Sequence, residues 1–131
     1  MTHTHSALFV RRLLLTDSLV SGLTGALMAV AAPVLESWLG LPAALLRFAG
    51  IALLPFAAVV GWFAMQASPA RAAVQAIVAT NFAWVAGSIL LLLASGLNPT
   101  SLGIAFVIFQ AVVVGFLGEL QYMAVRRTNI A

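Results

Sequence analysis

The chain has 131 residues, of which 63% are hydrophobic and only 7% are charged, and its mean hydropathy is +1.14. A soluble domain has roughly 25% charged residues, so a chain this apolar has too little polar surface to face water on all sides. The sequence contains no cysteine, which excludes a disulfide framework and any thiolate nucleophile or metal ligand. We therefore predict an integral membrane protein that forms a single all-α domain over residues 1–131.

The net charge of +3 comes from six arginines against three acids. Proteins that bind nucleic acids gather their basic residues in one patch or stripe. Here the arginines stand singly or in pairs at the ends of apolar runs, which is typical of membrane topology. We expect the lipid bilayer to be a partner and expect no nucleic-acid binding.

Four apolar runs predict membrane-spanning helices. Each is close to the ~20 residues that cross ~30 Å of hydrocarbon. In chain order the predicted spans lie at about residues 13–32, 43–65, 72–95 and 102–125. The first run, framed by "FVRRLLL" and "AVA", also has features of a cleaved signal peptide, but the presence of Asp17 and the full-span length favour a retained helix.

Short separators join these runs and set the topology. They are "PVLESWLGLP", "QASPAR" and "GLNP", which carry the prolines, glycines and polar residues that end and restart helices. Connections this short place neighbouring helices antiparallel, so we predict an up-down-up-down four-helix transmembrane bundle. Five of the six arginines then fall on one side and Arg47 falls on the other, which predicts that both termini are cytoplasmic.

The two halves of the chain resemble each other weakly. Residues 41–61 align without gaps on residues 98–118. "TDSLVSG" aligns on "TNFAWVAG" with one insertion, which places Asp17 over Asn81. The pattern fits either a tandem repeat of helical hairpins, related by an axis along the membrane normal, or chance similarity between apolar segments.

Small residues recur at helical spacing on the first two spans. Such stripes allow the backbones of neighbouring helices to approach closely in a membrane. They consist of Ser18, Gly22, Gly25 and Ala29 on the first span, and of Gly50, Ala57 and Gly61 on the second. We expect these faces to be packing surfaces, either within the chain or in a complex.

Polar side chains within the spans mark the candidate site. They are Asp17, Ser21, Asn81, Glu119 and Gln121. Helical spacing places Trp84 and Ser88 on the same face as Asn81. It also places Gln110 on the same face as Gln121. Because a charged carboxylate at the bilayer centre costs roughly 2.5–3.5 kcal/mol, the two acids are the first candidates for a functional role.

Two interpretations of these acids are open. Asp17 lies five residues after Arg12, and Glu119 lies seven residues before Arg126, which correspond to about 7–8 Å and about 10 Å along a helix axis. Both carboxylates can therefore reach the interfacial zone or an arginine, so they can form ion pairs that hold helix ends together. The alternative is a proton- or ion-linked role.

The remaining polar residues predict structural contacts rather than chemistry. Asn81 lies near mid-membrane, where its amide needs an interhelical hydrogen bond. On the outer side, Arg47 can extend toward the head groups or pair with Glu36. His3 and His5 have no third anchored ligand nearby in the sequence, so neither a metal site nor a cofactor is expected. No nucleophile–base motif or phosphate loop occurs, so the chain is not expected to be an enzyme.

Several segments carry a resemblance to a known group of proteins. With "LLLTDSLVSG", "LGLPAALLRFAG", "LLPFAAVVGW" and "GELQYMAVRR", the chain resembles small four-helix bacterial inner-membrane proteins that have no assigned activity. The resemblance covers most of the chain and implies a bacterial inner (plasma) membrane. It transfers no functional residue.

Two functions therefore follow from the residues. The first is a non-enzymatic structural or complex-forming membrane subunit, which forms a homo-oligomer or joins a larger complex. The second is a small oligomeric proton- or ion-linked transporter or channel, in which Asp17, Asn81 and Glu119 line a polar path.

Overall fold

The computed structural model of the chain describes residues 2–94 and 96–128, and within these residues it is all-helical. The side chains of residues 2–6, and with them His3 and His5, lie outside the described part. The helices are α1 (Thr2–Val30), α2 (Ala32–Leu39), α3 (Ala43–Ala64), α4 (Arg71–Ala94) and α5 (Ser101–Arg127). All except α2 are long and apolar enough to cross a membrane, which indicates a multi-pass membrane protein.

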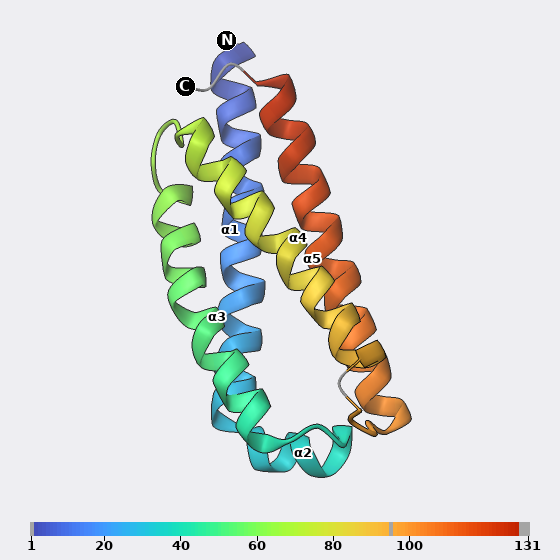
Figure 1. Ribbon diagram of the computed structural model, residues 1–131. Helices are drawn as coiled ribbons and strands as arrows, with labels where there is room; N and C mark the ends of the chain where they lie inside the picture. The colour runs from blue at the N-terminus through green and yellow to red at the C-terminus, as the bar shows by residue number, and fades with distance from the viewer. Residues whose placement is uncertain (1, 95, 129–131) are drawn as a thin grey trace.

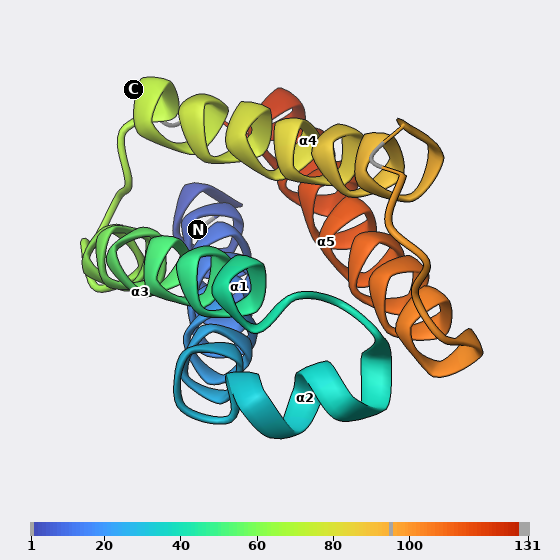
Figure 2. The same ribbon diagram turned by 60° about the horizontal axis from the view of Figure 1, so that its bottom comes forward.

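The four long helices form two hairpins (Figure 1). α1 packs along α3, and α4 packs along α5. The hairpins meet where α1 contacts α5, whereas α3 and α4 make almost no backbone contact. In Figure 1 the two pairs diverge toward the end that holds α2, and Figure 2 shows α2 between the α1–α3 pair and the start of α5.

The ends of the helices lie at two opposite ends of the molecule. In Figure 1 the start of α1, the segment that joins α3 to α4 and the end of α5 lie at one end, and α2 lies at the other. The bounds of α3, α4 and α5 agree to within two residues with the spans predicted at 43–65, 72–95 and 102–125, although residue 95 itself lies outside the described part. α1 begins well before the predicted residue 13, because residues 2–12 continue the same helix.

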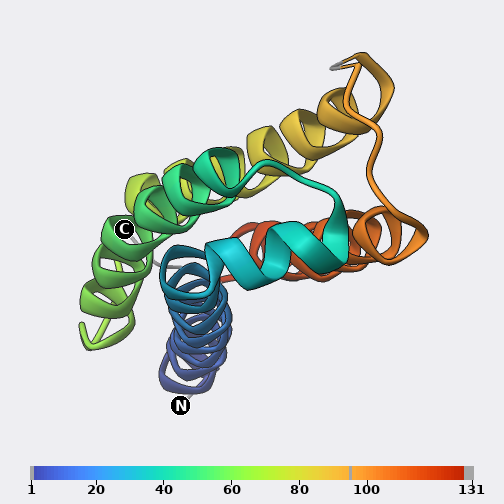
Figure 3. The same cartoon turned by 90° about the horizontal axis from the view of Figure 1, so that it is seen from below.

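The predicted connection at residues 33–42 does join the first two long helices, but most of it is helical, which the sequence pattern does not predict. Its residues up to Leu39 belong to α2, which lies across the end of the bundle (Figure 3). Pro33 falls in its first turn, where a missing N–H costs no hydrogen bond. Gly40 ends it in the left-handed conformation, at φ 69°, and donates its N–H to the Glu36 carbonyl.

α2 also joins the two hairpins at this end. The Thr100 N–H donates to the Leu39 carbonyl at 3.0 Å, and the Thr100 hydroxyl donates to the Trp38 carbonyl at 2.7 Å. The same hydroxyl oxygen accepts the Gly103 N–H at 3.0 Å and so caps the start of α5. Thr100 therefore fixes the start of α5 to the end of α2.

The predicted small-residue stripes of α1 and α3 are confirmed as packing faces, and they face each other. A Cβ atom on Gly25 would lie 2.8 Å from the Gly50 carbonyl oxygen. A Cβ atom on Gly50 would lie 2.6 Å from the Gly25 carbonyl oxygen and 2.7 Å from the Ala29 nitrogen. Farther along, the Ser18 hydroxyl donates to the Ala57 carbonyl at 2.7 Å. The stripes therefore form the α1–α3 contact within one chain.

The bundle is apolar outside and polar in places inside. Leu23 is 72% exposed, whereas Asp17 is 1% exposed. A soluble protein avoids large exposed apolar surfaces and keeps its acids in water. The reversed arrangement agrees with a bilayer around the long helices.

We predict that Gly50→Ala destabilises the bundle by about 1–3 kcal/mol. The new methyl group would clash with backbone atoms of α1, and only a shift of the whole helix could relieve that clash. The matched control is Gly87→Ala in α4, where a Cβ atom would have no neighbour within 4 Å. That variant should be neutral or more stable by about 0.5–1 kcal/mol, because alanine favours the helix. Unfolding in a mild detergent measures both, and equal effects would contradict the close α1–α3 contact.

Candidate functional site

A buried cluster of four polar side chains joins three helices. The Asn81 amide of α4 and the Gln121 amide of α5 each donate to Asp17 Oδ2 of α1 at 2.8 Å. The Ser21 hydroxyl, one turn further along α1, donates to Asp17 Oδ1 at 3.2 Å. The Asn81 amide also donates to Gln121 Oε1 at 3.0 Å, which closes a ring of hydrogen bonds. We call these four residues the Asp17 cluster.

The Asp17 cluster is enclosed by apolar side chains. Gln121 is completely buried, and Ser21 and Asn81 are buried as well. Toward the end of the bundle that holds the start of α1, a hydrophobic core covers the cluster and includes Leu14, Val74 and Ala124. About one turn of buried apolar residues therefore separates Asp17 from the arginines at that end.

The hydrogen bonds of Asp17 all come from neutral donors. Each is an amide or a hydroxyl group, and no arginine among the described residues forms an ion pair with it. Both oxygens of the carboxyl group accept hydrogen bonds in this arrangement. Burial of such a group is tolerated only when its hydrogen bonds are made, as they are here.

A second polar cluster lies farther toward α2. The Trp84 indole N–H donates to Gln110 Oε1 at 2.7 Å. The Gln110 amide donates to the Ser88 hydroxyl oxygen at 2.8 Å and to the Val107 carbonyl at 2.9 Å. The Ser88 hydroxyl donates back to the Trp84 carbonyl at 2.8 Å. This Trp84 cluster joins α4 to α5.

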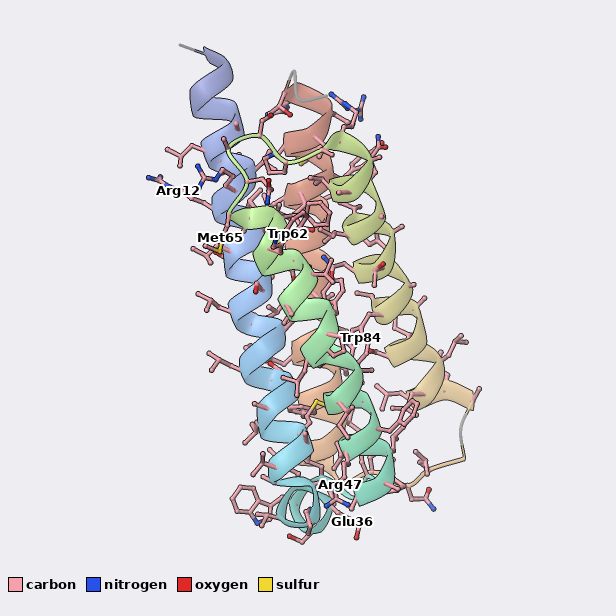
Figure 4. All side chains as sticks on the ribbon, turned by 90° about the vertical axis from the view of Figure 1, so that its left-hand side faces the viewer. Arg12, Glu36, Arg47, Trp62, Met65 and Trp84 are labelled. Atoms are coloured by element: carbon pink, nitrogen blue, oxygen red, sulfur yellow. The ribbon has the colours of Figure 1, made fainter. Side chains whose placement is uncertain are left out.

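The Trp84 cluster borders a groove between α3 and α4. The groove has a volume of about 440 Å³ and is lined mainly by apolar residues, such as Leu45 and Leu91. Figure 4 looks from the α3 side and shows Trp84 between the two helices. A smaller cavity of about 120 Å³ is lined by Trp84 and Gln110 at one side and by Ser21 at the other. It therefore lies between the Trp84 cluster and the Asp17 cluster.

Glu119 lies outside this interior. Its side chain is exposed on the outer surface of α5, and no group in the described part of the chain hydrogen-bonds or ion-pairs with it. Gln121, two residues further along α5, faces inward. Each residue of an α-helix is rotated by about 100° from the residue before it. The side chains of Glu119 and Gln121 therefore point to nearly opposite sides of α5.

The arginines and Glu36 bind backbone groups or face outward. Arg11 Nε donates to the Ala64 carbonyl at the end of α3, at 3.0 Å. The Glu36 carboxylate accepts the Ala43 N–H at the start of α3, at 2.5 Å. Glu36 and Arg47 lie at the same end of the molecule (Figure 4), but no ion pair joins them. Glu36 therefore serves as a cap for α3.

Of the candidate residues taken from the sequence, the structure gathers Asp17, Ser21, Asn81 and Gln121 at one place. It does not bring Glu119 to them. Gln110 was not among the candidates, although it follows helical spacing with Gln121 and therefore carried the signal.

We predict that Gln121→Leu destabilises the bundle by about 1–3 kcal/mol, because Asp17 loses a donor and the Asn81 amide loses an acceptor, both of them buried. Gln75→Leu makes the same chemical change at an exposed position of α4 and should alter stability little. The comparison uses the free energy of unfolding in a mild detergent. If both variants match the wild type, the cluster does not stabilise the fold.

Comparisons with known proteins add no relative to this geometry: no protein-family model, curated protein or solved structure matches the chain. The resemblance to small four-helix inner-membrane proteins therefore remains an expectation.

Proposed function

We propose that the chain is a non-enzymatic, multi-pass protein of a bacterial inner membrane and acts as a complex-forming subunit. The observation that carries this proposal is the position of Glu119. It is a carboxylate in a membrane-spanning helix, exposed on the outer surface, with no partner in the described part of its own chain.

The distribution of arginine and aromatic residues supports an orientation with both termini in the cytoplasm. Arg11, Arg12, Arg71, Arg126 and Arg127 belong to helix segments at the end that holds the start of α1. This is the excess that marks a cytoplasmic side. Exposed aromatic residues occur toward both ends, with Trp62 near the first and Trp38 near the second, as at two membrane interfaces.

The outer face of α5 is the surface that we assign to the partner. Phe109, Val112, Phe116 and Glu119 follow helical spacing and are all exposed. The three apolar residues suit either lipid or another helix. Glu119 distinguishes between them, because a carboxylate that faces hydrocarbon is costly and a neighbouring helix can supply a hydrogen-bond donor or a cation.

The small-residue stripes support the same assignment indirectly. The glycines of α1 and α3 are used inside the bundle, where Gly25 and Gly50 make the closest contact. They are therefore not free to bind another protein. A complex has to use a different surface, and the outer face of α5 carries the unpaired acid.

We predict that a photo-crosslinking amino acid at Phe116, which is 64% exposed, forms a protein–protein adduct in native membranes. Glu119→Leu should remove most of this adduct without lowering the stability of the bundle, because the carboxylate has no partner in its own chain. The control position is Leu23, exposed on α1, where we expect lipid adducts only. Denaturing gel electrophoresis and mass spectrometry identify the adducts.

Two results of this experiment count against the proposal. One is that position 116 reacts with lipid alone. The other is that its protein adduct persists unchanged in Glu119→Leu, since the acid would then have no part in the contact.

A proton- or ion-linked carrier is the second candidate, and the position of Asp17 favours it. Asp17 and Asn81, which the sequence alignment places over each other, are joined by a hydrogen bond between the two hairpins. The last glycines of the aligned segments also have matching surroundings, because Gly61 faces Ser18 and Gly118 faces Asn81 and Phe82. Transporters with tandem repeats bind their substrates and ions at such an interface between repeats.

The cavities form the route toward Asp17 that a carrier requires. The groove between α3 and α4 reaches the Trp84 cluster, and the smaller cavity leads on to Ser21 beside Asp17. Glu119 lies on the other side of α5 and takes no part in this route within one chain. The carrier candidate therefore depends on Asp17 and Asn81.

For the carrier we predict that the wild type, reconstituted in liposomes under an imposed membrane potential, acidifies the lumen faster than protein-free liposomes do. Asp17→Asn should reduce the rate to that of protein-free liposomes, because the substitution removes the titratable group. Glu36→Gln is the control and should keep the wild-type rate, because Glu36 belongs to α2 and lines neither the groove nor the smaller cavity. A pH-sensitive dye follows the flux, and a wild type without flux would exclude proton conduction.

A further inference from the structure

We propose that a pocket between α4 and α5 binds an anionic membrane phospholipid by its phosphate group. The pocket has a volume of about 280 Å³ and lies on the outer surface, where α4 begins and α5 ends. This site is separate from the Asp17 cluster, and it does not depend on the partner proposed for Glu119.

The polar end of the pocket carries two guanidinium groups. Arg71 of α4 and Arg126 of α5 both line it, and no Asp or Glu among the described residues does. Gln75 and Tyr122 add an amide and a phenol group. A phosphate with a single negative charge complements this set of donors, and arginine forms strong hydrogen bonds to phosphate.

Both guanidinium groups have contacts that fix their positions. Arg71 Nη2 donates to the Thr128 carbonyl at 2.7 Å. The guanidinium carbon of Arg126 lies 5.6 Å from the centre of the Tyr122 ring, in a cation–π contact. The two cations are therefore held beside the same pocket from two different helices, which limits the ordering that binding requires.

The rest of the pocket is apolar and lies deeper in the membrane. Val78, Ala79 and Phe82 line it, about two to three turns beyond Arg71 along α4. The order from the helix end inward is thus cationic, polar and apolar. A phospholipid has the same order of chemistry from its phosphate to its acyl chains, whereas a soluble anion has no group for the apolar part.

The depth of the pocket also suits a lipid. Arg71 begins α4 and Arg126 belongs to the last turn of α5, so both lie where the helices leave the hydrocarbon. Basic pockets between membrane helices bind acidic lipid head groups at this level. Glu119 is the nearest acid on this face of α5, but it lies seven residues before Arg126, about 10 Å along the axis, and does not line the pocket.

The test measures the unfolding midpoint of the purified protein in a mild detergent with added lipid. Phosphatidylglycerol should raise the midpoint, and phosphatidylcholine with the same acyl chains, or inorganic phosphate, should not. Arg126→Gln should remove most of this rise. Arg127→Gln is the matched control and should retain it, because Arg127 is an exposed neighbour with the same charge that does not line the pocket.

A second variant tests the apolar part without changing the charge. Ala79→Phe places a ring where we locate the start of an acyl chain, and it should reduce the rise caused by phosphatidylglycerol. Native mass spectrometry should show fewer retained phosphatidylglycerol molecules for this variant and for Arg126→Gln than for the wild type.

Three outcomes would overturn the proposal. Equal losses in Arg126→Gln and Arg127→Gln would show a general effect of surface charge. An equal rise with phosphatidylcholine, which has the same phosphate but no net charge, would show that the site does not select anionic lipids. An equal rise with inorganic phosphate would show a site for soluble anions.

Discussion

A carboxylate inside a membrane protein has to receive its hydrogen bonds from the protein, because hydrocarbon offers none. Asp17 receives them from its own helix through Ser21 and from the second hairpin through Asn81 and Gln121. These contacts require α1, α4 and α5 to meet at one depth and with one rotation of each helix. A shift by one residue would turn the side chains about 100° away from each other. The cluster therefore determines how the two hairpins are aligned.

The other contacts between the hairpins fit around this alignment. α1 and α3 are held together by the glycine contact. At the opposite end, Thr100 fixes the start of α5 to α2. α3 and α4 have no comparable connection, and the groove lies between them. The groove is thus a consequence of which helices are tied together.

The sequence predicts the elements of this fold better than their contacts. Hydropathy identifies the four long helices because each must cover the thickness of a bilayer. It misses α2, because a short apolar helix across the bundle and a short apolar connection have similar compositions. The small-residue stripes can be identified in the sequence, because close contacts between membrane helices need residues without large side chains.

The candidate site was only partly predictable for a similar reason. Spacing along a single helix puts Asp17 within reach of Arg12, but in the structure Leu14 and its neighbours lie between Asp17 and that end. Glu119 and Gln121 are both polar residues of an apolar helix, and the sequence does not show which of them faces inward. Gln121 faces inward because Asp17 of α1 accepts its amide N–H and Asn81 of α4 donates to its amide oxygen. Contacts of this kind depend on the relative rotation of helices far apart in the chain.

The separation of these residues has a consequence for biosynthesis. Gln121 follows Asp17 by 104 residues, and Asn81 follows it by 64. The glycine contact between α1 and α3 can form as soon as the first hairpin has entered the membrane. Asp17, however, lacks two of its three donors until α4 and α5 have followed. A chain that stops before residue 121 therefore leaves Asp17 without the Gln121 donor, and the two hairpins without the contact that aligns them.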